Sequence, residues 1–163
     1  MKTNPPTREI RVQIDSRFEL IELVQRLADD VCRTAGLGRD ATMNIGLAIR
    51  EAVANAIKHG NRLEAEKQVS VVFRLGPRKV MVAVRDQGAG FDLNEVEDPL
   101  DPGNLFKSDG RGIFFMKSFV DDVAFSRLRG GGMEVRMEKR IQKRACGWQD
   151  AANAARREGG EVG

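Results

Sequence analysis

The chain has 163 residues, of which 41% are hydrophobic and 31% are charged, as expected for one folded domain. No apolar run approaches the roughly 20 residues that a membrane-spanning helix needs, and the charged, proline-containing N-terminus does not resemble a secretory signal. Two cysteines, Cys32 and Cys146, argue against a disulfide framework and against a zinc site. We therefore predict a cytoplasmic protein that does not bind membranes.

The excess positive charge is confined to the C-terminal end of the chain. Residues 1–138 contain 21 Lys or Arg and 21 Asp or Glu, whereas residues 139–163 contain 6 and 3, which accounts for the net charge of +3. A basic tail without an aromatic platform is a weak signal for nucleic-acid binding. We predict one domain over residues 1–140, a basic and mobile tail over 141–163, and no direct nucleic-acid partner.

Hydrophobic periodicity predicts the order of the secondary-structure elements. In chain order we expect a strand, two helices, two strands, a helix and two strands, at residues 8–14, 18–31, 40–59, 69–75, 80–84, 112–120, 123–127 and 133–138. This order differs from the strand–helix alternation of a doubly wound parallel sheet. It predicts the α+β class, as a two-layer sandwich of a mixed sheet with helices on one face.

The second predicted helix carries three polar residues, Glu51, Asn55 and His59, at a spacing of four. Residues four apart lie on one side of a helix, and the neighbouring residues are small or apolar. A polar stripe in a buried surface costs free energy unless it lines a site. An Asn oxygen suits Mg²⁺, and a Glu one turn earlier could orient a water or accept a proton. The alternative is an exposed helix face with a Glu–Asn contact and a capping His.

Two glycine-containing loops follow this helix in the sequence. The first, from Asp86 to Asp92, leaves a predicted strand, and its Gly88 and Gly90 permit close backbone approaches. The Asp86 carboxylate can accept a hydrogen bond from a ligand amino group, as adenine recognition requires. The alternative is a plain Asp-x-Gly turn at the end of a strand.

The second loop, Lys107 to Ile113, opens the third predicted helix. Gly110 and Gly112 expose backbone N–H groups at the helix start, where they form a cradle for phosphate, and Arg111 adds a positive charge. A lone Gly-x-Gly is weak evidence, and the alternative is an ordinary N-terminal turn. The helix and both loops together, in this order, indicate binding of Mg-ATP.

These segments together resemble the motifs of one known ATP-binding family. Residues 51–61 resemble the N-box of the GHKL (Bergerat) fold, which gyrase-type ATPases, MutL proteins and histidine kinases share. Residues 86–92 and 110–113 resemble its first and second glycine boxes. The short segment between them, followed by Gly-Arg-Gly-Ile-Phe-Phe-Met, is similar to the anti-sigma factor serine/threonine kinases. The resemblance covers about residues 8–140.

The resemblance implies a Bergerat fold, the cofactors ATP and Mg²⁺, and a role for each motif residue. Glu51 would be the catalytic base, Asn55 the Mg²⁺ ligand, and Asp86 the partner of the adenine amino group. The expected nucleotide-binding residues are Asn55, Lys58, His59, Asp86, Gly88, Gly90, Ser108, Gly110, Arg111, Gly112 and Ile113.

The resemblance also implies partner proteins. Members of the family phosphorylate a STAS-type anti-anti-sigma factor and sequester a sigma factor, usually as homodimers, through surfaces near the N-terminal strand and first helix. We predict an anti-sigma factor with serine/threonine kinase activity. The alternative is a nucleotide-binding regulatory module without kinase activity. Met133 favours this alternative, because the family commonly places there a Thr that supports adenine binding.

Overall fold

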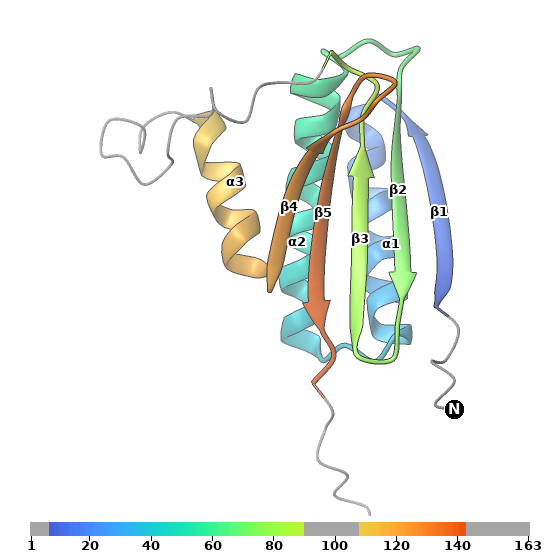
Figure 1. Cartoon of the computed structure of the whole chain (residues 1–163), viewed down its shortest axis with the longest axis vertical. Coiled ribbons are helices and arrows are strands. Elements are labelled where there is room, and N and C mark those ends of the chain that lie inside the picture. The colour runs from blue at the N-terminus through green and yellow to red at the C-terminus, as the bar shows by residue number, and fades with distance from the viewer. Residues whose placement is uncertain (1–6, 90–107, 143–163) are drawn as a thin grey trace, which may run out of the picture.

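The computed structural model describes residues 7–89 and 108–142, with side chains in the second range from residue 112. Five strands form one sheet in the order β1-β2-β3-β5-β4, and helices cover one of its faces (Figure 1). The elements are β1 (Arg8–Asp15), η1 (Phe18–Leu20), α1 (Ile21–Thr34), α2 (Arg39–Asn55), η2 (Ala56–Gly60), β2 (Gln68–Leu75), β3 (Lys79–Arg85), α3 (Ser108–Phe119), β4 (Asp122–Arg127) and β5 (Met133–Arg140).

The α+β class and the two-layer sandwich are confirmed, but the expectation of a mixed sheet is wrong for the strands described. Every pairing among them is antiparallel. The chain passes from β3 to β4 through α3, so these two strands run in the same direction and would form a parallel pair as neighbours. However, β5 folds back from β4 as a hairpin and lies between them, antiparallel to both.

The two faces of the sheet have opposite character. The inner face packs on α1 and α2, where apolar side chains are almost completely buried, among them Val24, Ile45, Ile57, Phe73 and Val82. The outer face carries cross-strand ion pairs, namely Arg74–Glu9, Lys79–Glu138 and Arg85–Glu134. This alternation within each strand is why period-two patterning predicted the strands correctly.

The third helix begins earlier than the sequence pattern indicated. We expected it to start at residue 112, where the apolar periodicity begins, yet α3 begins at Ser108. Glycine disfavours a helix by only about 1 kcal/mol per residue, and α3 as a whole packs against α2. The segment between the two glycine boxes and the predicted basic tail lie largely outside the described residues. No helix in the described part of the chain is long and apolar enough to span a membrane.

Candidate functional site

Helix α2 carries the first group of predicted site residues. Glu51 and Asn55 lie one turn apart on it, and both are half-buried. The helix then widens into the π-helical turn η2, which holds Lys58 and His59, both exposed. The predicted stripe at a spacing of four therefore ends at Asn55, because the wider turn changes the angle between successive residues. π-helical turns often occur at functional sites.

Asp86 directly follows β3 and is buried, with 8% of its surface exposed. Its Oδ1 accepts hydrogen bonds from the backbone N–H groups of Gly88, at 2.9 Å, and Met133, at 3.1 Å. Burial raises the pKa of Asp86, although these two donors and the nearby charge of Lys67 act in the opposite direction. The described hydrogen bonds both reach Oδ1, which leaves Oδ2 available to a ligand donor.

Backbone packs directly against the Asp86 carboxyl group. A Cβ atom on Gly60 would overlap this carboxyl, and a Cβ on Gly88 would overlap the carbonyl oxygen of Gly60. The end of η2 and the first glycine loop thus approach each other more closely than residues with side chains could. We call Asp86, Gly60, Gly88 and Met133 the Asp86 end of the site.

A second close approach joins α2 to α3. A Cβ atom on Gly112 would overlap Oε1 of Glu51, so the second glycine loop lies against the carboxylate of the first motif. Ile113 is half-buried and packs on the apolar core. We call Glu51, Asn55 and Gly112 the Glu51 end. Because α2 runs into η2, the two ends lie roughly 13 Å apart along one helix axis.

The remaining predicted residues are described only in part. Gly90 lies outside the described residues. Ser108, Gly110 and Arg111 belong to the first turn of α3, but their side chains are not among those described.

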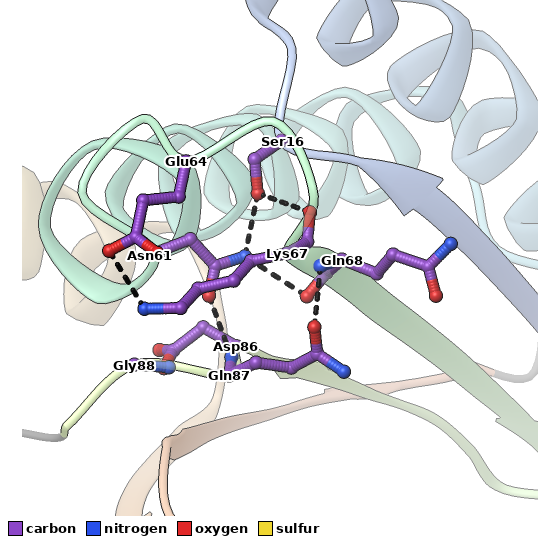
Figure 2. Close-up of polar contacts among 8 residues, drawn as sticks. All are labelled: Ser16, Asn61, Glu64, Lys67, Gln68, Asp86, Gln87 and Gly88. Atoms are coloured by element: carbon purple, nitrogen blue, oxygen red, sulfur yellow. Dashed lines mark hydrogen bonds and ion pairs between the residues drawn. The ribbon is translucent and has the colours of Figure 1, made fainter.

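Sequence reasoning missed three residues that hold the Asp86 end together. Asn61 is completely buried, and it connects Ser16 at the end of β1 with the backbone of Gln87 (Figure 2). Asn61 follows the glycine at the end of the predicted helix and closes the segment that resembles the N-box, but the sequence analysis gives it no role. A buried Asn at such a helix end is a signal that could have been used, whereas nothing in the sequence pairs Ser16 with a residue 45 positions away.

The side-chain oxygens of the Glu51 end are ligands that suit Mg²⁺, but they are too few to hold the ion without other ligands. Within the described ranges, no group of three or more His, Cys, Asp or Glu side chains could hold a metal ion. A cation at Asn55 therefore needs phosphate and water oxygens as further ligands, which is how Mg²⁺ is usually held beside nucleotides.

Comparison with known sequences shows which family this chain belongs to. Residues 14–139 match the model of the histidine kinase-like ATPase domain. The chain belongs to this family. The serine-protein kinase RsbW of Listeria innocua is 25% identical in an alignment of 142 residues that covers 83% of this chain and 89% of the relative. The serine-protein kinase RsbW of Staphylococcus epidermidis is 26% identical in an alignment of 141 residues that covers 82% of this chain and 87% of the relative.

A solved structure supports the fold alone. The crystal structure of the RsbU and RsbW domains of a Mycobacterium tuberculosis protein superposes with a TM-score of 0.63 at 18% identity, over 86% of this chain. The chain spans 34% of that crystallised chain. The resemblance inferred from the motifs is thus confirmed at the level of the family, and ATP is the ligand that membership of an ATPase family implies.

Proposed function

We propose that the protein is an anti-sigma factor with ATP-dependent serine/threonine kinase activity, which phosphorylates a STAS-type anti-anti-sigma factor and sequesters a sigma factor. The observation that carries this proposal is the placement of two carboxylates along the α2–η2 segment, Glu51 on α2 and Asp86 from the end of β3 against Gly60. At one end Asp86 offers Oδ2 beside a backbone-lined cradle. At the other, Glu51 lies against the second glycine loop. Relatives named serine-protein kinases support the same activity.

Each residue has a separate task in this proposal. Asp86 accepts a hydrogen bond from the adenine amino group, and Asn55 supplies one oxygen to Mg²⁺. Glu51 accepts the proton of the attacking Ser or Thr hydroxyl of the partner protein. Mg-ATP supplies the transferred phosphoryl group and the charge neutralisation that the reaction needs.

Exposed apolar residues at the N-terminal edge support a protein partner. Ile10 of β1, Phe18 of η1 and Leu23 of α1 are 37%, 49% and 54% exposed. They lie on neighbouring elements, and exposed apolar groups on adjacent elements are typical of protein-binding surfaces. We assign this edge to the sigma factor and to a second copy of the chain.

Calorimetric titration with Mg-ATP tests the nucleotide site. We expect Asn55→Ala to weaken binding at least tenfold, because a charge-assisted contact contributes roughly 1.5–3 kcal/mol. Asn44→Ala is the matched control, since Asn44 is also half-buried and lies on the same face of α2, roughly 16 Å earlier. We expect it to change the affinity less than twofold. Absence of binding to the wild type would overturn the nucleotide site.

Phosphate transfer separates the kinase from the regulatory alternative. We expect the wild type to transfer the γ-phosphate of ATP to a STAS-domain protein of the same organism. Glu51→Gln should reduce the rate at least 100-fold, since general-base catalysis contributes roughly 10² to 10⁴. Glu66→Gln, at an exposed loop position, should leave it unchanged. Binding of ATP without transfer would favour the regulatory module that Met133 suggests.

A further inference from the structure

We propose that Asn61 is a positioning residue for base recognition, because it holds the backbone that immediately follows Asp86. The inference rests on the proposed nucleotide-binding function and adds to it Asn61, which ends the segment that resembles the N-box but is not among the expected nucleotide-binding residues. Asn61 does not touch the ligand in this proposal. It acts through Gln87 on the orientation of the Asp86 carboxylate.

The side-chain amide of Asn61 uses both of its groups. Its Oδ1 accepts a hydrogen bond from the backbone N–H of Gln87 at 2.7 Å. Its Nδ2 donates to the hydroxyl of Ser16 at 2.7 Å and to the carbonyl oxygen of Gln68 at 3.0 Å. This set of partners determines the amide orientation, since a flipped amide would place its donors against the Gln87 N–H.

The Gln87 contact controls the peptide that carries Asp86. The N–H of Gln87 belongs to the peptide unit whose carbonyl is that of Asp86, so holding this N–H restricts the backbone rotation beside the carboxylate. The side chain of Gln87 adds a second contact, because its Oε1 accepts a hydrogen bond from the backbone N–H of Gln68 at 2.7 Å. Figure 2 shows Asn61 and Gln87 bridging from η2 to the loop of Asp86 and Gly88. On the other side of the Cα atom, the backbone N–H of Asp86 donates to the carbonyl oxygen of Met133 at 3.1 Å, so Asp86 is held on both sides.

Ser16 anchors the other side of the amide. Its hydroxyl accepts from Asn61 and donates to the carbonyl oxygen of Lys67 at 2.8 Å, and its backbone N–H reaches the same oxygen at 3.1 Å. Ser16 is 5% exposed and lies between β1 and η1. Its contacts fix the loop before β2 but do not reach Gln87. This separation allows stability and base recognition to be tested independently.

The loop after Asn61 also depends on this anchor. Arg62 and Leu63 adopt left-handed backbone conformations with φ of 54° and 62°, which cost free energy in residues that have side chains. Such conformations persist only where surrounding contacts determine them. The Leu63 N–H bond to the Ile57 carbonyl, at 2.9 Å, and the buried Asn61 side chain supply those contacts.

The test compares ATP, GTP and inorganic tripolyphosphate, each with Mg²⁺, by calorimetry. Asn61→Ala should lower ATP affinity at least tenfold and reduce the preference for ATP over GTP at least fivefold. Tripolyphosphate affinity should stay within twofold, because the Glu51 end is untouched. Ser16→Ala should lower the thermal midpoint but keep the ATP preference. Asn61→Asp should keep the ATP preference, because a carboxylate still accepts from the Gln87 N–H, but it should lower the thermal midpoint, because its second oxygen would face the carbonyl oxygen of Gln68.

A nucleotide-free measurement accompanies the titrations. Amide hydrogen exchange at Gln87 and Gly88 should accelerate at least tenfold more in Asn61→Ala than in Ser16→Ala, relative to the global opening of each variant. Unchanged ATP preference in Asn61→Ala, or equal exchange in both variants, would overturn the inference alone. A wild type that binds neither nucleotide would overturn the proposed function as well.

Discussion

The Asp86 end and the Glu51 end are held in place by different kinds of contact, backbone contacts at the first and a side-chain contact at the second. At the Asp86 end, backbone groups surround the functional side chain: two N–H donors bind Oδ1, and glycine backbone packs against the carboxyl. At the Glu51 end, the described contact is a side chain against one glycine, where two helices meet. Backbone positions are fixed by the fold, whereas a glutamate side chain can change its rotamer at small cost.

This difference indicates which of the two carboxylates needs a fixed orientation. A purine is recognised by hydrogen bonds of fixed direction, which suits a carboxylate held in place before the ligand arrives. A phosphoryl group and a partner hydroxyl arrive separately, which suits a catalytic carboxylate that can move. We therefore expect substitutions at the Asp86 end to damage binding and folding together. Substitutions of Glu51 and Gly112, which do not supply the Mg²⁺ ligand, should separate binding from transfer.

Gly88→Ala should have the largest effect. Its Cβ would overlap the backbone carbonyl of Gly60, which cannot move without displacing the end of η2. We expect a loss of about 3 kcal/mol in the free energy of unfolding and more than 100-fold in ATP affinity. Gly130→Ala is the control, since a Cβ there meets nothing within 4 Å and its backbone lies outside the left-handed region. Denaturant titration measures the free energy of unfolding, and calorimetry measures the ATP affinity. Equal losses in Gly88→Ala and Gly130→Ala would contradict the close backbone packing at Gly88.

Asp86→Asn tests the carboxylate without disturbing its surroundings. The amide oxygen can accept from Gly88 and Met133 as Oδ1 does, but its NH₂ would face the adenine amino group, donor against donor. ATP affinity should fall about 10- to 150-fold, the equivalent of roughly 1.5–3 kcal/mol. Retention of wild-type affinity would show that Asp86 does not contact the base.

The difference in stability between Asp86→Asn and the wild type should depend on pH. Burial raises the pKa of Asp86, so the folded wild type binds this proton more tightly than the unfolded chain does. Protonation of Asp86 therefore stabilises the folded wild type at low pH. This contribution is complete below the ordinary aspartate pKa of about 3.9 and is lost as the pH rises through the higher folded value. The stability of Asp86→Asn relative to wild type should therefore increase with pH across that window. A flat difference in urea titrations from pH 3 to 7 would contradict it.

The sequence was most informative where chemistry and local pattern coincide. The period-two strands and the helices could be predicted from local pattern, and Glu51, Asn55 and Asp86 were selected as site candidates by their residue types and spacing. Asn61 could not be given its role, because its partners Ser16 and Gln87 are brought together only by the tertiary fold. The antiparallel sheet was missed for a similar reason, since periodicity does not say that β5 lies between β3 and β4.

A double-variant cycle tests the Glu51 end. Alanine is favoured over glycine within a helix by roughly 1 kcal/mol, so Gly112→Ala should stabilise α3 where space allows. In the wild type this gain is offset, because the new Cβ displaces Glu51. In a Glu51→Ala background, Gly112→Ala should raise the free energy of unfolding by about 1 kcal/mol, and the coupling should be measurable in urea. Additive effects would show that Glu51 and Gly112 are not in contact.

Gly112→Ala alone should also separate the two activities. With Glu51 displaced, phosphate transfer should fall about tenfold while ATP affinity changes less than threefold, because Asp86 is unaffected. Gly46→Ala is a matched control, since its Cβ would likewise meet the end of a flexible acidic side chain, Asp29, on the helix pair away from the site. A parallel loss of binding and transfer in Gly112→Ala would argue against a separate Glu51 end.

Met133→Thr should have the smallest effect, and it decides whether the departure from the family pattern matters. The backbone N–H of Met133 already supports Asp86, and this bond does not depend on the side chain. A hydroxyl at this position should improve ATP affinity by about fivefold, since one neutral hydrogen bond contributes about 1 kcal/mol. Met137→Thr is the control: it lies four residues later on the same face of β5, is completely buried, and should lose stability without changing affinity. Met133 is itself only 2% exposed, so both variants should lose stability and only the change in affinity separates them. If Met133→Thr gains no affinity, the Met133 side chain serves packing alone. Base recognition would in that case rest on Asp86 and the backbone that holds it.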